Sequence, residues 1–155
     1  VGIPQRADIV LASAGGYPKD LDLYQAQKAL DNAGHAVREG GIIVLAAACE
    51  AGLGNGTFEA WMTGASCPEA ILERIQREFV LGGHKAAAIA GLLQRARVHL
   101  VSRLPDETVR RCGLVPFDDL EAALAAAFEE LGDAASVAVF PQAGSVLPAV
   151  DSPDA

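Results

Sequence analysis

The sequence predicts an α/β domain of three layers, with a mainly parallel sheet of four or five strands and helices on both faces. Short and almost uninterrupted apolar runs recur along the chain, as expected of strands that are buried on both faces. Segments with apolar residues at helical spacing separate these runs, and this alternation is typical of parallel sheets. Together these observations place the chain in the Rossmann-like class of folds.

The predicted strands are the apolar runs. The first covers residues 8–13 (DIVLAS) and ends at the turn-forming pair Gly15-Gly16. The second covers residues 41–47 (GIIVLAA) and leads into a segment rich in glycine. We predict three further strands at residues 98–101, 114–117 and 136–140.

Capping residues and apolar stripes define the predicted helices. Asp20 is a suitable N-cap for a helix that runs to residue 32. Ser66 and Glu69 have capping-box spacing before a helix that runs to residue 81, with Phe79 in its apolar stripe. The remaining helices are predicted at residues 84–96, at 105–113 and, after the capping pair Asp118 and Glu121, up to Gly132.

Residues 1–145 are predicted to form one α/β domain, and residues 146–155 an irregular tail. The chain begins at Val1 without an initiator methionine. This start indicates a piece of a longer protein, although a trimmed terminus would look the same.

Composition argues against two classes of partner. The formal net charge of −8 disfavours binding to nucleic acid, whose phosphates require a cationic surface. The longest apolar runs, such as residues 42–49, are far shorter than the roughly 20 residues of a membrane-spanning helix. Three cysteines, Cys49, Cys67 and Cys112, lie far apart without a pairing pattern, which indicates reduced thiols in a cytoplasmic protein.

Ligands of open parallel sheets bind outside the carboxyl ends of the strands. This rule singles out residues 14–28 and residues 49–64 as candidate binding segments. In the first, Gly15 and Gly16 allow a tight turn, and Tyr17 precedes a proline that stiffens the exit.

The helix after this turn carries three polar side chains on one face. On a helical wheel, Tyr24, Gln25 and Lys28 lie together on the side opposite the apolar stripe. They lie in the first two turns, near the positive end of the helix dipole, and would suit a small anion such as a carboxylate. The alternative is an ordinary solvated helix face.

The second segment is less specific. Residues 52–57 (GLGNGT) only partly resemble a dinucleotide fingerprint, because Thr57 stands where the third glycine is required. We interpret this segment, which includes Gly54, as a wall or lid beside the first loop. Glu50 is a candidate acid–base group, or alternatively a solvated loop acid.

Among the three histidines, His84 is the one favoured for a ligand contact, because it follows two glycines at a predicted helix start. His35 is expected to be exposed, and His99 to pack inside a strand. None has metal-ligand spacing with another histidine or a cysteine, so we expect no metal site in this chain.

A set of sequence blocks resembles a known family. Residues 12–20 (ASAGGYPKD) followed by residues 23–29 (LYQAQKA) form the most specific block. Together with the supporting blocks given next, it resembles the C-terminal domain of the nickel-dependent lactate racemase family. The blocks occur in the family's order and span nearly the whole chain. The supporting blocks are residues 39–45 (EGGIIVL), the glycine-rich loop with Phe58, residues 83–86 (GHKA), residues 101–106 (VSRLPD) and residues 141–148 (PQAGSVLP).

The resemblance implies a two-domain racemase or epimerase of 2-hydroxy acids that uses a nickel-pincer nucleotide. In that family the N-terminal domain holds the cofactor and the acid–base histidines, and the C-terminal domain closes the cleft over the substrate. By matching position, Gln25 and Lys28 would contact the substrate carboxylate, with Tyr24 beside them. His84 matches a pocket position that is aromatic or histidine in the family, so we hypothesise a larger or more polar hydroxy acid than lactate.

The resemblance also implies that the reactive groups lie elsewhere. We expect no catalytic residue and no bound cofactor in this chain alone, and we expect its own N-terminal domain as a partner. The competing interpretation is a small-anion (carboxylate) binding module that has no catalytic partner.

Overall fold

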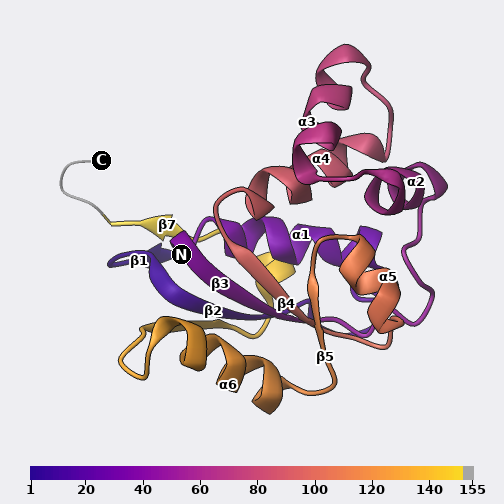
Figure 1. Ribbon diagram of the computed structural model, residues 1–155. Helices are drawn as coiled ribbons and strands as arrows, with labels where there is room; N and C mark the ends of the chain where they lie inside the picture. Colours follow the sequence, from indigo (N-terminus) through magenta and orange to yellow (C-terminus); the bar gives the residue numbers. More distant parts are fainter. Residues whose placement is uncertain (152–155) are drawn as a thin grey trace.

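The computed structural model describes residues 1–151 and contains a five-stranded sheet (Figure 1). The strands are all parallel, in the order β5-β4-β3-β2-β6, so the predicted parallel α/β sheet is confirmed with five strands. The strands are β2 (Ala7–Ser13), β3 (Val37–Ala46), β4 (Arg97–Val101), β5 (Val115–Phe117) and β6 (Val137–Phe140).

Helices cover both faces of the sheet, but unequally. Within the described residues, α6 (Leu120–Leu131) lies by itself on one face, and the other helices gather on the opposite side (Figure 1). That larger group consists of α1 (Leu23–Gly34), α2 (Gly56–Gly64), α3 (Pro68–Arg77), α4 (Gly83–Leu93) and α5 (Asp106–Arg111). Between residues 1 and 151, no helix is long and apolar enough to span a membrane.

Side chains of the central strand β2 point alternately into two core clusters, one on each face of the sheet. Val10 and Ala12 belong to the larger core cluster, which includes the buried faces of α1 and α4. Ile9 belongs to the smaller cluster, together with Ala123 of α6. Successive strand residues point to opposite faces, so a strand that is covered on both sides is apolar throughout.

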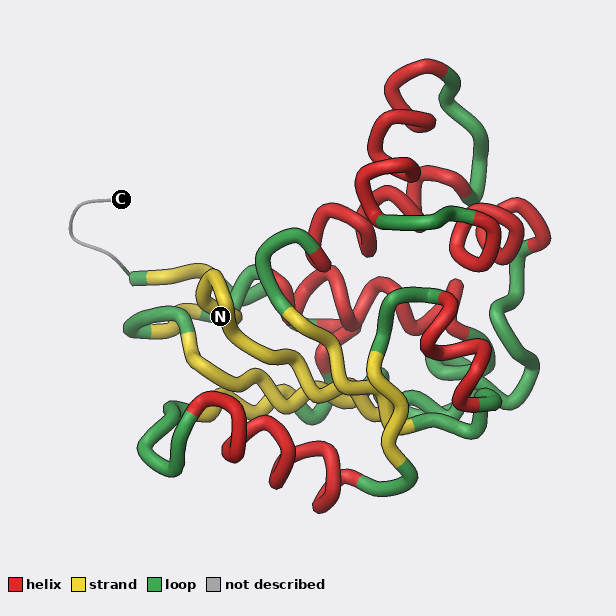
Figure 2. Tube along the Cα trace, in the orientation of Figure 1, coloured by secondary structure: helices red, strands yellow, loops and turns green. Residues whose placement is uncertain are grey.

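The strand order creates a switch point beside β2. From β2 the chain passes to β3, β4 and β5 on one side, and then returns through α6 to β6 on the other side. Loops that follow the strands gather at one edge of the sheet (Figure 2). The loops after β2 and β6 therefore flank the position where α/β sheets most often bind ligands.

Two predicted N-caps are wrong by one or two residues. Asp22, not Asp20, caps α1, and the Asp20 carboxylate instead accepts a hydrogen bond from the Ala48 N–H at 3.1 Å. Asp119, not Asp118, caps α6. An N-cap requires an extended backbone and a side chain that reaches back to the first turn, and Asp22 and Asp119 meet both conditions.

The predicted start and end of α3 also differ from the structure. Cys67 is its N-cap and makes no side-chain capping bond, so the capping box of Ser66 and Glu69 is not formed. The helix stops at Arg77, because Glu78 adopts an extended conformation. Phe79, predicted to be in the apolar stripe, therefore lies beyond the helix and is 75% exposed.

The segment predicted as a glycine-rich loop contains α2. Asn55 caps this helix by accepting a hydrogen bond from the Phe58 N–H at 3.0 Å. Phe58, Trp61 and Met62 are buried in the larger core cluster. Their burial outweighs the low helix propensity of the glycines at both ends.

The predicted irregular tail is partly regular. β7 (Ala149–Val150) pairs in parallel with β1 (Gly2–Ile3) in a separate two-stranded sheet. Just before it, the short helix η1 (Ala143–Ser145) packs near α1. Residues 152–155, the last part of the predicted tail, lie outside the described residues.

Candidate functional site

A pocket of about 170 Å³ lies at the switch point, between the loop after β2 and η1, which follows β6. Gln25 and Lys28, two of the predicted binding residues, both line it, and so do two polar residues that were not predicted, Lys19 and Ser145. The remaining lining residues are Ala14, Ala29 and Gly144. No acidic side chain lines this pocket within the described part of the chain.

The two faces of α1 orient Gln25 and Lys28. Leu23, Ala26 and Leu30 are buried against the core, as the helical wheel predicts. Gln25 and Lys28 are exposed on the other side. The amide and the ammonium group therefore project from adjacent turns of one helix into the same pocket.

The backbone at the start of α1 is already occupied by protein groups. The N–H groups of Leu23 and Tyr24 donate to the carbonyl oxygens of Gly52 and Leu53, each at 3.1 Å. The N–H of Gln25 donates to the Asp22 carboxylate at 2.7 Å. Because these N–H groups are already paired, an anion at this site would be bound by side chains.

Gly54 helps to place this cap. Its φ is +93°, and a Cβ there would lie 2.6 Å from the carboxyl carbon of Asp22. The close approach requires glycine at this position. The second glycine-rich segment therefore serves as a support for the first turn of α1, which agrees with its interpretation as a wall beside the first loop.

Tyr24 points away from the pocket lined by Gln25 and Lys28. Its ring meets Phe58 of α2 edge-to-face, with centroids 5.6 Å apart. The ammonium group of Lys85, on α4, lies 3.9 Å from the centroid of the same ring. The structure therefore separates Tyr24 from the other two predicted residues and places it between three helices.

All three lysines of the chain surround the first half of α1. Lys19 donates from Nζ to the Ser145 hydroxyl at 3.1 Å, and Lys28 lines the same pocket. Lys85 donates to the Tyr24 carbonyl at 2.8 Å. Among residues 1–151 the salt bridges are made by arginines, and these three ammonium groups take no part in one. Two of the three ammonium groups, those of Lys19 and Lys28, thus line one pocket, and the third lies beside Tyr24, outside that pocket.

Lys19, Ser145 and Lys85 were missed as site residues because the wheel considered α1 alone. Each of them lies within a block that carried the family resemblance, at residues 12–20, 141–148 and 83–86. The family resemblance of these blocks therefore pointed to the right segments. It did not indicate which residue of each block contacts α1.

The weaker predictions fall in a second depression. Tyr17 and Glu50 line a cavity of about 230 Å³ together with Asp20, Leu21 and Ala48. Glu50 also pairs with Arg103 at 3.3 Å, and both side chains are largely exposed. Gly15 and Gly16, with φ of +97° and +80°, form the predicted turn between this depression and the pocket of Gln25 and Lys28.

His84 stands at the start of α4, as predicted, but does not line the pocket of Gln25 and Lys28. Its Nδ1 accepts a hydrogen bond from the Gly82 N–H at 3.1 Å, and its ring lies 5.9 Å from that of Phe79. It is half-buried, next in sequence to Lys85. The residue that contacts Tyr24 is the neighbouring Lys85.

The other two histidines are placed as predicted. His35 is exposed at the end of α1. His99 is buried, its Nδ1 lies 3.1 Å from the Ala123 carbonyl, and its ring packs 4.7 Å from that of Phe117. Burial lowers the pKa of His99, so the neutral ring is favoured.

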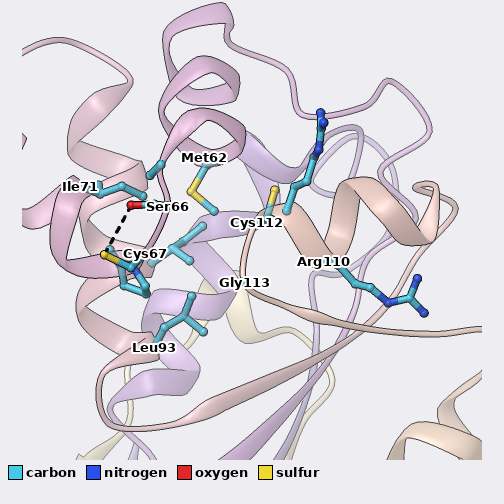
Figure 3. A pocket seen from close by; sticks show the side chains of 13 residues that line it. Met62, Ser66, Cys67, Ile71, Leu93, Arg110, Cys112 and Gly113 are labelled. Atoms are coloured by element: carbon cyan, nitrogen blue, oxygen red, sulfur yellow. Dashed lines mark hydrogen bonds between the residues drawn. The ribbon is translucent and has the colours of Figure 1, made fainter.

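A separate cavity of about 120 Å³ lies between α2, α3, α4 and the end of α5 (Figure 3). Met62, Ile71 and Leu93 give it an apolar lining, and Cys67 and Cys112 also line it. Burial raises the pKa of the Cys112 thiol to about 11, which leaves it protonated and a poor nucleophile. Arg110 and Arg111 also line this cavity, but none of its lining residues is among the predicted site residues, whereas the pocket at the switch point holds Gln25 and Lys28.

The described residues do not fit a resident metal centre. Across residues 1–151 there is no group of three or more histidine, cysteine or acidic side chains that could hold an ion. Both buried thiols are protonated, because burial also raises the pKa of Cys49 to about 12. The donor groups of residues 1–151 therefore do not match the ligand set of a metal centre.

The fold and the site define a class of protein: a parallel α/β domain with a cationic pocket at its switch point. The sequence matches the family model described as the lactate racemase C-terminal domain over residues 3–148. This chain belongs to that family.

Individual relatives agree with this assignment. The lactate racemase of Thermoanaerobacterium thermosaccharolyticum is 30% identical over 146 residues, which cover 91% of this chain and 34% of the relative. The lactate racemase of Lactiplantibacillus plantarum is 28% identical over 145 residues, or 90% of this chain and 34% of that protein. The chain thus spans about a third of the length of these relatives.

Solved structures show the same architecture. The lactate racemase apoprotein from T. thermosaccharolyticum matches with a TM-score of 0.90 and 29% identity, over 96% of this chain and 37% of that one. A Thermotoga maritima protein matches with a TM-score of 0.63 and 14% identity, over 97% of this chain and 39% of that one. This second likeness supports the fold alone.

Proposed function

We propose that this chain is the substrate-clamping C-terminal domain of a nickel-pincer-dependent racemase or epimerase of 2-hydroxy acids. Residues 1–145 would form the domain, and an N-terminal domain would complete the enzyme. The observation that carries the proposal is the pocket at the switch point, where Gln25 and Lys28 project from one helix. Membership in the lactate racemase C-terminal domain family supports it.

The chemistry of the pocket suits a carboxylate. Lys28 supplies a positive charge, and the Gln25 amide supplies N–H donors to a second carboxylate oxygen. Lys19 and the Ser145 hydroxyl line the same space. Because no acidic side chain lines it in the described part of the chain, a bound carboxylate would meet donors on several sides.

The role of this chain would be to hold and orient the substrate. Under this proposal the nickel nucleotide and the histidines that move protons belong to the N-terminal domain, since the residues described here do not fit a metal. The site of action would be the cytoplasm, where Cys49, Cys67 and Cys112 remain free thiols.

A second candidate is a small-anion binding module without a catalytic partner. One observation favours it: two ammonium groups, an amide and a hydroxyl already line one pocket, and no acidic side chain lies among its lining residues in the described part of the chain. Such a module would bind a carboxylate without converting it.

The full-length protein distinguishes the two candidates. Nickel analysis, mass spectrometry for a covalent nucleotide and a racemisation assay over a panel of D- and L-2-hydroxy acids would be run on one preparation. The enzyme proposal expects nickel, an adduct and interconversion of at least one pair. Binding of hydroxy acids without nickel, adduct or interconversion would refute it in favour of the binding module.

A further inference from the structure

Helices α1 and α4 are joined at both ends by the same kind of bond. Near the start of α1, Lys85 Nζ donates to the Tyr24 carbonyl at 2.8 Å. At its end, Arg95 Nη2 donates to the Gly34 carbonyl, also at 2.8 Å. Each bond connects a cation on or just after α4 with a backbone oxygen of α1, and only the first lies beside the pocket.

Lys85 acts on a peptide unit that is held from two sides. The Tyr24 carbonyl belongs to the same peptide group as the Gln25 N–H, which donates to the Asp22 carboxylate at 2.7 Å. Lys85 holds the oxygen of this group and Asp22 holds its N–H. In an α-helix the same oxygen also accepts the N–H of the residue four positions on, which is Lys28. The peptide group thus connects both proposed carboxylate ligands.

The side chain of Lys85 makes a second contact with the same residue, Tyr24. Its ammonium group lies 3.9 Å from the Tyr24 ring centroid, a cation–π geometry. Burial lowers the pKa of Lys85, and the charge of Lys28 lowers it further while that of Asp22 raises it. The two distances to Tyr24 fix the position of the ammonium group beside the first turn of α1.

We propose that Lys85 is a positioning residue for the carboxylate site, which fixes the Tyr24–Gln25 peptide group and so sets Gln25 and Lys28 in place. This inference rests on the proposed function for the meaning of the site. It adds a residue on α4 that reaches the pocket only through α1. A lysine suits the role, because a single ammonium on a thin stem can meet a carbonyl and a ring face at once.

The test uses the full-length protein with Lys85→Met, Lys85→Arg and the matched control Arg95→Met. The control removes the equivalent bond at the other end of α1. For a converted 2-hydroxy acid, we expect Lys85→Met to raise KM about tenfold, with kcat changed less than about threefold. Lys85→Arg should recover most of the affinity, and Arg95→Met should leave KM within about twofold of wild type.

Hydrogen exchange of α1 gives a readout that does not depend on activity. Lys85→Met should speed exchange in residues 23–29, and Arg95→Met should speed it in residues 30–35. An unchanged KM in Lys85→Met, or an equal rise in Arg95→Met, would overturn the positioning role. So would wild-type exchange in residues 23–29 of Lys85→Met.

The two proposals fail in different ways. If the wild-type protein converts no 2-hydroxy acid, the proposed function has failed. The exchange pattern then decides the positioning role without reference to the reaction: local exchange at residues 23–29 supports it, and its absence overturns it.

Discussion

Asp22 accepts a hydrogen bond at 2.7 Å from the backbone N–H of Gln25, so the residue that caps α1 also fixes the backbone of a proposed carboxylate ligand. Gly54 lies against the same carboxylate, and the carbonyls of Gly52 and Leu53 hold the preceding two N–H groups. The second glycine-rich segment therefore controls the geometry of the site through the helix cap.

The cap predicts a coupled loss of stability and affinity. Asp22→Ala should lower the free energy of unfolding by about 1 kcal/mol and raise KM severalfold, because the turn that carries Gln25 loosens. Asp119→Ala is the matched control, since Asp119 caps α6 with the same 2.7 Å bond, to Ala122, on the far face of the sheet. It should lower stability by a similar amount and leave KM unchanged. Equal KM values in the two variants would contradict the coupling.

Gly54→Ala should impair the site more than Gly52→Ala. Both glycines have φ near +90°, so both substitutions strain the backbone by about 1 kcal/mol. A Cβ at Gly54 would overlap the Asp22 carboxylate, whereas one at Gly52 would meet nothing within 4 Å. Denaturant unfolding and KM should therefore show an additional loss in Gly54→Ala only. Indistinguishable variants would show that the close contact is unimportant.

His99 should make stability depend on pH in the weakly acidic range. Its pKa is lowered in the folded state, chiefly by burial, so the unfolded chain binds the proton more readily. Its contribution is complete above the unfolded value of about 6.5 and is lost as the pH falls through the lower folded value. Urea unfolding between pH 7.5 and pH 5.5 should show this decline, and His99→Gln should flatten it. An equal decline in the stability of His99→Gln would show that other titratable groups cause the pH dependence.

His84 is predicted to influence which hydroxy acid is used. The family resemblance implies a position in the substrate pocket, whereas the structure places His84 beside Lys85 at the start of α4 and outside the pocket of Gln25 and Lys28. In the full-length protein, His84→Ala should change the order of kcat/KM across a panel of hydroxy acids of different size and polarity. An unchanged order would contradict a role for His84 in substrate choice.

The sheet and the polar face of α1 could be predicted from the sequence for related reasons. Both depend on periodicity: continuous apolar runs for β2 and β3, and helical spacing of Leu23, Ala26 and Leu30. Burial of these positions follows from pattern alone, because each element must cover its apolar side.

The capping residues and distant partners could not be predicted in the same way. Asp20 and Asp22 have the same chemistry two positions apart, and the Ala48 N–H that engages Asp20 belongs to another segment. Lys19 and Ser145 are 126 positions apart in sequence and meet only because β2 and β6 are neighbours. Such contacts follow from the strand order, which local patterns do not specify.

The proposed contact of Lys28 and Gln25 with a substrate carboxylate can be tested by the kinetics of Lys28→Ala in the full-length protein. A charge-assisted hydrogen bond contributes about 1.5–3 kcal/mol, so kcat/KM should fall by about one to three orders of magnitude. Gln25→Ala should produce a smaller loss, as expected for a neutral donor. Wild-type kinetics in Lys28→Ala would show that Lys28 does not hold the substrate.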